Sequence, residues 1–230
     1  MAASENKPPA RGGRFAGLLL RALSAVVLGP LLLAAVWFGF PWIDLVAAVA
    51  APLMILEWSR LTRGAPVLRV LAWTYGLAAL VTLLWLRHQP VSGRETILWV
   101  LACIWATDIG AYFVGRTAGG AKLAPSISPG KTWSGLVGGM AWAAVASAAI
   151  GYAFGLGETV HLAIAGAALA IVGQAGDLLE SAAKRRAGVK DSGRLIPGHG
   201  GLLDRIDGLM AVLAAVGIAR LVAGGSWPWT

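Results

Sequence analysis

Apolar residues occur in long runs along this chain, and shorter polar segments separate them. Each run approaches the roughly 20 residues that an α-helix needs to cross the hydrocarbon core of a bilayer. The runs predict spans near Leu18–Phe38, Trp42–Trp58, Val67–Leu86, Thr96–Val114, Leu136–Phe154, His161–Leu179 and Ile206–Ala223. The predicted fold class is therefore all-α: a polytopic transmembrane helical bundle of about seven spans.

The composition agrees with this pattern. Hydrophobic residues make up 57% of the 230 residues and charged residues 13%, whereas a soluble domain carries about 25% charged residues. The mean hydropathy is +0.72. We expect residues 1–17 to form a basic, disordered cytoplasmic tail and residues 18–230 to form a single membrane-embedded domain. Cys103 has no second cysteine with which to form a disulfide.

Basic residues are concentrated on one predicted side of the membrane. If the N-terminus is cytoplasmic, the loops on the same side are 59–66, 115–135 and 180–205. Of the 19 lysines and arginines, all but Arg87, Arg94 and Arg220 then lie in or beside cytoplasmic segments. Cytoplasmic loops of membrane proteins are enriched in these residues, so this orientation is predicted. The net charge of +8 reflects topology and attraction to anionic lipid, and it does not indicate nucleic-acid binding.

Carboxylates from three spans are expected at one membrane depth. Asp108 lies inside the fourth span, Asp177 and Glu180 end the sixth, and Asp204 and Asp207 open the seventh. An ionised residue within a span costs about 2.5–3.5 kcal/mol on insertion scales, so its presence there needs a reason. Acids beside a basic cluster are suited to a divalent metal that holds a polyphosphate.

Local ion pairs are the alternative for the acids that border water. Glu180 stands one turn before Lys184, and the two aspartates of the seventh span flank Arg205. Asp108 has no basic residue within one turn, so this explanation suits it less well. For Asp108 the competing interpretation is a hydrogen bond to a hydroxyl group on a neighbouring helix.

Two other ionisable residues have ordinary interpretations. Glu57, at the end of the second span, is expected to pair with Arg60 at the membrane interface. His199 can cap or hydrogen-bond its own loop.

The segment 116–139 is rich in glycine, serine and proline. Its tripeptide Gly130-Lys131-Thr132 fits the end of a Walker motif, but Pro125 occupies the position of the first glycine. No strand is expected before the tripeptide either, so we reject a Walker motif. Lys122, Lys131 and backbone N–H groups of this loop can still approach phosphates.

Two Gly-x-x-x-Gly patterns, at residues 135–139 and 151–155, allow close helix crossings. Packing within the chain is the favoured interpretation. A seam between two copies in a homodimer is the alternative.

The segment 181–207 resembles the signature of the phosphatidate cytidylyltransferases, also called CDP-diacylglycerol synthases. That signature runs S-x-x-K-R, four residues, K-D, and a short spacer to P-x-H-G-G-x-x-D-R-x-D. The matching residues are Ser181, Lys184, Arg185, Lys190, Asp191, Pro197, His199, Gly200, Gly201, Asp204, Arg205 and Asp207. Asp108 in TDIGAYFVGR, SPGKTW at 128–133 and GDLLES at 176–181 also resemble family segments, so the likeness covers about residues 105–209.

The resemblance implies a catalytic domain that transfers cytidylyl from CTP to phosphatidate with Mg²⁺, with a second metal ion as an option. It places the protein in a bacterial-type inner membrane, with the active site facing the cytoplasm. The implied catalytic residues are Lys190, Asp191, His199, Asp204, Arg205 and Asp207. The implied phosphate- and substrate-binding residues are Ser128, Lys131, Thr132, Ser181, Lys184, Arg185, Gly200 and Gly201. The implied metal ligands are Asp108, Asp177, Asp191, Asp204 and Asp207.

Two other functions are alternatives. A CTP-dependent polyprenol or dolichol kinase acts on a hydroxyl acceptor and therefore needs a base, which the signature does not favour. An ion-coupled transporter built around Asp108 requires paired broken helices in matching halves of the chain, and the sequence has no such halves.

We predict that the segment 188–204 is cytoplasmic and that 87–95 faces outside, because of the distribution of basic residues. In a Cys103→Ala background, an impermeant maleimide should label Ser192→Cys from the cytoplasmic side only and Ser92→Cys from outside only. The opposite pattern would contradict the orientation and the proposed location of the site.

Overall fold

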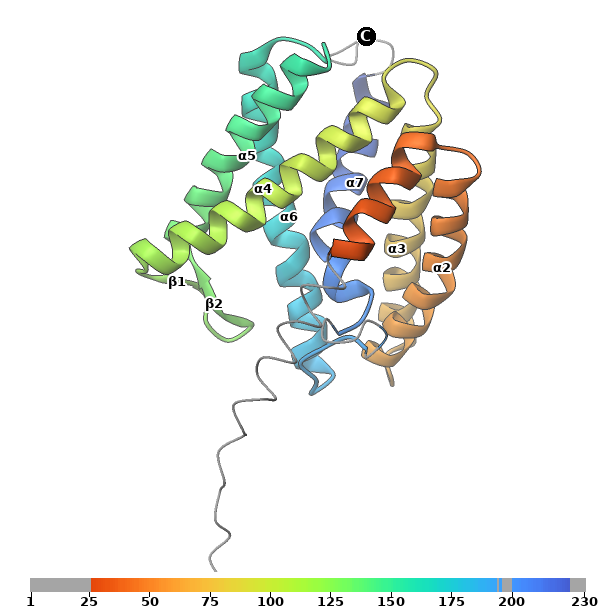
Figure 1. Cartoon of the computed structure of the whole chain (residues 1–230). Coiled ribbons are helices and arrows are strands. Elements are labelled where there is room, and N and C mark those ends of the chain that lie inside the picture. Colours follow the sequence, from red (N-terminus) through yellow and green to blue (C-terminus); the bar gives the residue numbers. More distant parts are fainter. Residues whose placement is uncertain (1–25, 194, 196–199, 224–230) are drawn as a thin grey trace, which may run out of the picture.

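The protein is a bundle of antiparallel helices with one small hairpin, as a computed structural model of residues 26–193, 195 and 200–223 describes (Figure 1). The elements are the helix Val26–Phe38 followed by α2 (Trp42–Leu61), α3 (Pro66–Arg87), α4 (Gly93–Ala118), β1 (Lys122–Ala124), β2 (Ser128–Thr132), α5 (Trp133–Ala153), α6 (Thr159–Arg186) and α7 (Leu203–Ala223).

Six of the described helices, α2 to α7, are long and apolar enough to cross a membrane. They correspond to six of the seven predicted spans, and the predicted fold class is confirmed. The first predicted span begins outside the described residues, and its described part is the helix Val26–Phe38. The proposed tail, residues 1–17, also lies outside them.

Several helices extend beyond the apolar runs that predicted them. α6 continues to Arg186 and not to Leu179, and α4 continues to Ala118 and not to Val114. Helical backbone hydrogen bonds do not require apolar side chains, and basic residues in a last turn interact favourably with the helix dipole. As a consequence, one continuous helix fixes the spacing of Asp177, Glu180 and Lys184.

The segment between α4 and α5 contains a β-hairpin, so the expectation that no strand precedes Gly130-Lys131-Thr132 was wrong. β1 pairs antiparallel with β2, with Lys122 opposite Thr132 and Ala124 opposite Ser128. The tripeptide itself lies inside β2 and not in a loop between a strand and a helix. This geometry still excludes a Walker motif.

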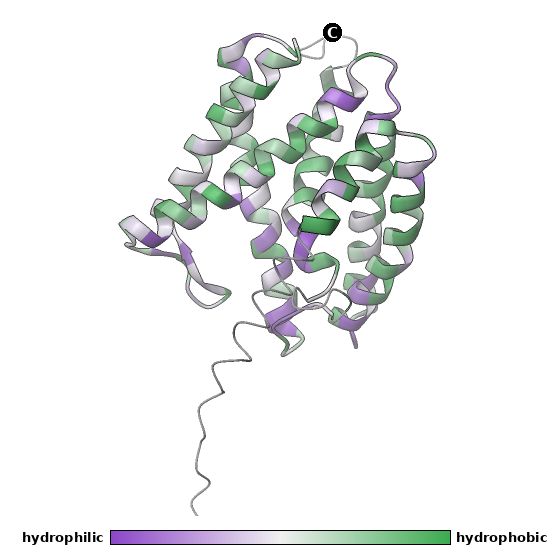
Figure 2. Cartoon of the chain, viewed as in Figure 1, coloured by the Kyte–Doolittle hydropathy of each residue, from purple (hydrophilic) through white to green (hydrophobic). Residues whose placement is uncertain are grey.

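The polar connections gather at one end of the bundle. The hairpin, the turn between α2 and α3 and the segment between α6 and α7 all lie at the lower end in Figure 1. Figure 2 shows hydrophilic residues concentrated at the same end of α6 and α7. The alternation of helix directions thus places the three predicted loops on one side, as the sequence indicated.

Apolar residues form a core between the helix Val26–Phe38, α2, α3, α4 and α7. Its buried members include Val36, Ile43, Met54, Leu86, Ile97, Val100, Met210, Val212, Leu213 and Val216. Other large apolar side chains point outward, among them Val49, Val70, Val81, Val145 and Leu221. An apolar exterior is what a helix needs in contact with lipid.

The first Gly-x-x-x-Gly pattern packs within the chain. A Cβ atom on Gly135 would lie 3.0 Å from the Ala111 carbonyl oxygen, and one on Gly139 would lie 3.0 Å from that of Thr107. Both glycines therefore face α4. The homodimer alternative receives no support from this motif, because α4 already covers it.

Candidate active site

The lower halves of α6 and α7 are in close contact. A Cβ atom on Gly176 would lie 2.8 Å from the Asp207 carbonyl oxygen, and one on Gly208 would lie 3.2 Å from that of Gly173. Larger residues at these positions would separate the helices. The close approach brings Asp177 of α6 and Asp207 of α7 to the same space.

Asp177, Glu180 and Asp207 form a cluster that could bind a metal ion. One carboxylate oxygen of each lies within 4.8 Å of those of the other two. Glu180 is fully buried, and its Oε1 atom has no hydrogen-bond partner among the described residues. Carboxylates at this separation repel one another unless a cation or a proton compensates. Their oxygen donors fit a hard divalent cation.

Lys184 joins this cluster to the start of α7. Its Nζ atom lies 2.6 Å from Glu180 Oε2 and 2.6 Å from Asp204 Oδ1. The expected Glu180–Lys184 pair is therefore present, although it is buried and not at the water interface. Lys184 also forms an ion pair with Asp204, a partner 20 positions away in sequence.

Asp204 also fixes the segment before α7. Its Oδ2 atom accepts hydrogen bonds from the Ser192 backbone N–H at 2.9 Å, from the Ser192 hydroxyl at 2.9 Å and from the Gly201 N–H at 2.8 Å. N–H groups at a helix start need such acceptors because the helix itself provides none. Asp204 is thus engaged in holding backbone, and a metal role for it stays a prediction.

Glu57 was assigned to Arg60 from the sequence, and that expectation was wrong. Its carboxylate is 4% exposed and accepts hydrogen bonds from the N–H groups of Leu202 and Leu203, both at 2.9 Å, and from the Ser192 hydroxyl at 2.8 Å. Arg60, three residues away in sequence, is not its partner because the Glu57 side chain points into the bundle.

Ser192 is correspondingly buried, with 4% exposure. It is therefore a poor position for cysteine labelling. Lys122, which is exposed in β1 at the same end of the bundle, is a better one.

The hairpin reaches α6 through two contacts. Lys131 Nζ lies 2.5 Å from Asp177 Oδ2, and Arg185 Nε donates to the Ile127 carbonyl oxygen at 3.2 Å. Thr132 instead caps α5, because its side chain accepts from the Gly135 N–H at 3.0 Å. Lys131 is therefore the hairpin side chain placed closest to the acids, while Ser128 is half-buried in β2.

A polar cavity of about 250 Å³ opens between α4, α6 and α7. Its lining includes Thr107, Asp108, Asp177, Asp204, Arg205 and Asp207. Four of the five aspartates that the sequence grouped are thus brought together. Asp191 is not among them: it lines a separate cavity of about 440 Å³ with Arg60, Arg63 and Arg186.

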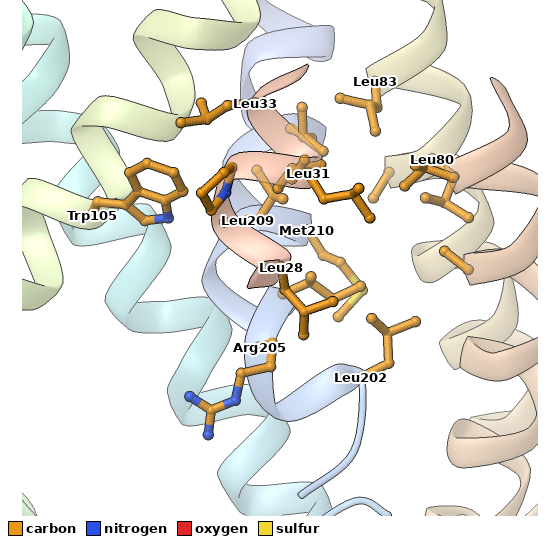
Figure 3. A pocket seen from close by; sticks show the side chains of 18 residues that line it. Leu28, Leu31, Leu33, Leu80, Leu83, Trp105, Leu202, Arg205, Leu209 and Met210 are labelled. Atoms are coloured by element: carbon orange, nitrogen blue, oxygen red, sulfur yellow. The ribbon is translucent and has the colours of Figure 1, made fainter. Parts of the chain in front are cut away.

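An apolar cavity of about 640 Å³ adjoins the polar one (Figure 3). Leucines and Met210 surround it, and Trp105 closes one side. Arg205 and Leu209 line both cavities. In Figure 3 the guanidinium group of Arg205 points away from the leucines. An amphiphile can therefore place its tail in one cavity and its polar end near the acids.

The remaining predicted residues occupy varied positions. Ser181 donates to Asp177 Oδ1 at 3.2 Å, which orients that carboxylate. Lys190 and Arg185 are exposed. Gly200 has a φ of +84°, a conformation that favours glycine. His199 lies outside the described residues, and the roles assigned to all five stay predictions.

The sequence placed Glu180 with the other acids, three residues after Asp177 on the same helical face, but Glu180 was not counted among the metal ligands because a pair with Lys184 was expected. Glu57 was missed altogether. For Glu57 the useful signal was weaker, namely a carboxylate in an otherwise apolar segment. Its partners are more than a hundred positions away in sequence, so no local pattern indicated them.

Comparison with known proteins identifies the class to which this fold and site belong. Residues 67–222 match the model of the cytidylyltransferase family. The phosphatidate cytidylyltransferase of Brucella suis is 35% identical, over 86% of this chain and 91% of its own length. The phosphatidate cytidylyltransferase of Rickettsia bellii is 34% identical, over 84% of this chain and 86% of its own length. That of Pseudomonas aeruginosa is 40% identical, over 75% of this chain and 61% of its own length. The chain belongs to the cytidylyltransferase family, and the resemblance seen in its sequence is confirmed.

The contacts of Asp204 predict that Asp204→Asn lowers the free energy of unfolding by about 1.5–3 kcal/mol, the range for hydrogen bonds to a charged group. The amide carries no charge to compensate Lys184, and its NH₂ group cannot accept from the N–H donors. Thermal unfolding of the purified protein, without added metal, measures this.

Asp207→Asn is the matched control, because the described hydrogen bond of Asp207 is to the adjacent Gly208 N–H at 2.8 Å. We expect it to change stability by less than about 1 kcal/mol. Equal destabilisation by the two substitutions would contradict the structural role of Asp204.

Proposed function

We propose that this protein transfers the cytidylyl group of CTP to phosphatidate and so forms CDP-diacylglycerol and pyrophosphate. The observation that carries the proposal is the junction of two cavities, one polar and lined by four aspartates and Arg205, and one apolar. Family membership and the names of the relatives support the same reaction.

In this reaction a phosphate oxygen of phosphatidate attacks the α-phosphorus of CTP. A new P–O bond forms, the bond from that phosphorus to the α–β bridging oxygen breaks, and pyrophosphate leaves with the electron pair. The attacking oxygen is already anionic near neutral pH, so a general base is not needed. The main obstacle is the repulsion between two polyanions and the charge that develops on the leaving group.

The described side chains are suited to reducing this repulsion. Lys131, Lys184 and Arg205 lie at the polar cavity or on its acids and provide positive charge for phosphates. Asp177, Glu180 and Asp207 would hold Mg²⁺, which supplies charge stabilisation to a triphosphate when bound. Lys131 and Lys184 already compensate acids of the site, so their ammonium groups are positioned before substrate arrives.

The site is proposed to face the cytoplasm, where CTP is available. The basic residues of the hairpin and of the last turn of α6 gather at the end of the bundle that carries the acids. This bias agrees with the positive-inside rule. The lipid substrate would arrive from the adjoining leaflet.

Turnover is the direct test of the function. Purified protein with Mg²⁺, phosphatidate and CTP labelled in the cytidine should transfer the label to lipid and release pyrophosphate. Phosphorylation of a polyprenol without transfer of cytidine would support the kinase instead. Absence of labelled lipid from an intact, folded preparation would contradict the proposal.

The acid cluster predicts a specific defect for Glu180→Gln. Because an amide holds a divalent cation much less well than a carboxylate, the Mg²⁺ concentration for half-maximal turnover should rise about tenfold or more. Direct binding of Mn²⁺, followed by its electron paramagnetic resonance, should weaken in parallel. Glu158→Gln, in the exposed pair with His161 outside the cluster, is the control and should leave both values unchanged.

The apolar cavity predicts a chain-length effect. Leu80→Phe should fill part of it and cost binding of a long acyl chain about 1 kcal/mol, equivalent to roughly a fivefold rise in KM for dioleoyl phosphatidate. Dihexanoyl phosphatidate should be affected much less. Val81→Phe, on the exposed side of α3, is the matched control. Equal effects of Leu80→Phe on both lipids would argue against an acyl chain in this cavity.

A further inference from the structure

Glu57 connects α2 to the start of α7 across the bundle. Its two oxygens accept hydrogen bonds from the N–H groups of Leu202 and Leu203, both at 2.9 Å, and the Ser192 hydroxyl lies 2.8 Å from Oε2. These partners are 135 or more positions away in sequence. An anion at the N-terminus of a helix satisfies N–H donors and interacts favourably with the helix dipole. Glu57 thus supplies α7 with a cap from another helix.

The segment before α7 is shaped around this carboxylate. A Cβ atom on Gly193 would lie 2.6 Å from Glu57 Oε1, and one on Gly201 would lie 2.5 Å from each Glu57 oxygen. A side chain at either position would force the Glu57 carboxylate to shift. Glycine therefore lets the backbone approach Glu57 in its observed position, and this gives Gly201 a role that does not involve a phosphate.

The position of Glu57 determines where the acids of α7 lie. Leu203 is the first residue of α7, and Asp207 follows just over one turn later. A helix is stiff over this length, so a displacement of its first turn moves Asp207 relative to Asp177 and Glu180. The Ser192 hydroxyl contacts Asp204 Oδ2 at 2.9 Å as well as Glu57, which couples the two carboxylates that hold the turn.

We propose that Glu57 is a positioning residue for the reaction: it fixes the start of α7 and thereby places Asp207 within the acid cluster. This inference rests on the proposed cytidylyl transfer. Glu57 does not line the polar cavity, so it acts through α7 and not on a substrate.

The proposal predicts a loss of kcat that a role in stability alone would not produce. A misplacement of about 1 Å costs a reaction up to about 100-fold, so Glu57→Gln should lower kcat by about 10- to 100-fold in the folded fraction. The carboxamide can accept through one oxygen, and its NH₂ group faces N–H donors. KM for CTP should change by less than about threefold, since no cavity side chain is removed.

The experiment compares Glu57→Gln and Glu57→Asp with Asp44→Asn. Asp44 is a carboxylate at the opposite end of α2, where it lies 3.3 Å from His88, and it serves as the matched control. Hydrogen exchange of the segment 189–209 provides a readout that does not need activity. Glu57→Gln should accelerate exchange at Leu202 and Leu203, and Glu57→Asp should recover part of both the protection and kcat.

Unchanged exchange in Glu57→Gln would overturn the role of Glu57 whatever the activity. An unchanged kcat, or an equal loss in Asp44→Asn, would overturn it as well. If wild-type protein transferred no cytidylyl group, the proposed function would fail, while the exchange result would still report whether Glu57 holds α7.

A milder substitution tests the proposal if Glu57→Gln does not fold. Ser192→Ala removes the hydroxyl between Glu57 and Asp204 and leaves both carboxylates in place. It should accelerate exchange at the start of α7 and lower kcat. Unchanged exchange and kcat in Ser192→Ala would likewise overturn the proposal.

Discussion

The first N–H groups of α7 have no carbonyl acceptor within the helix, and this end of α7 lies inside the bundle. Two carboxylates from different parts of the chain accept from N–H groups at and just before the start of α7: Glu57 from Leu202 and Leu203, and Asp204 from Gly201 and Ser192. Leaving such buried groups without partners would cost about 1–3 kcal/mol each. The arrangement of α2, the segment before α7 and α7 itself therefore depends on these hydrogen bonds, and the position of Asp207 depends on that arrangement.

Charge compensation explains how so many acids are tolerated at one depth. Lys184 lies between Glu180 and Asp204, and Lys131 from the hairpin reaches Asp177. Breaking a buried ion pair leaves an uncompensated charge, which is strongly unfavourable. The lysines that compensate these acids are also the groups proposed to contact a phosphate, so one set of side chains would serve both stability and the proposed binding.

The two adjoining cavities give the site its amphiphilic character. α7 lies between them, with Arg205 and Leu209 lining both and the acids lining the polar one. A lipid phosphate carries a charged end and an apolar end that cannot share one environment. A boundary between a charged cavity and an apolar cavity, with Arg205 and Leu209 lining both, provides both environments side by side.

The amino-acid sequence determined the helical class, six of the spans and the one-sided distribution of charge, because hydrophobic periodicity and positive charge act locally or statistically along the chain. It also placed Asp177 and Glu180 on one helical face, since helix geometry fixes that spacing. The tertiary structure alone decided which acids meet. Asp191 lines a different cavity from the other four aspartates, Asp204 pairs with Lys184, and Glu57 points toward α7 and not toward Arg60. These contacts depend on how distant helices pack, and no local spacing encodes the separation between α2 and α7.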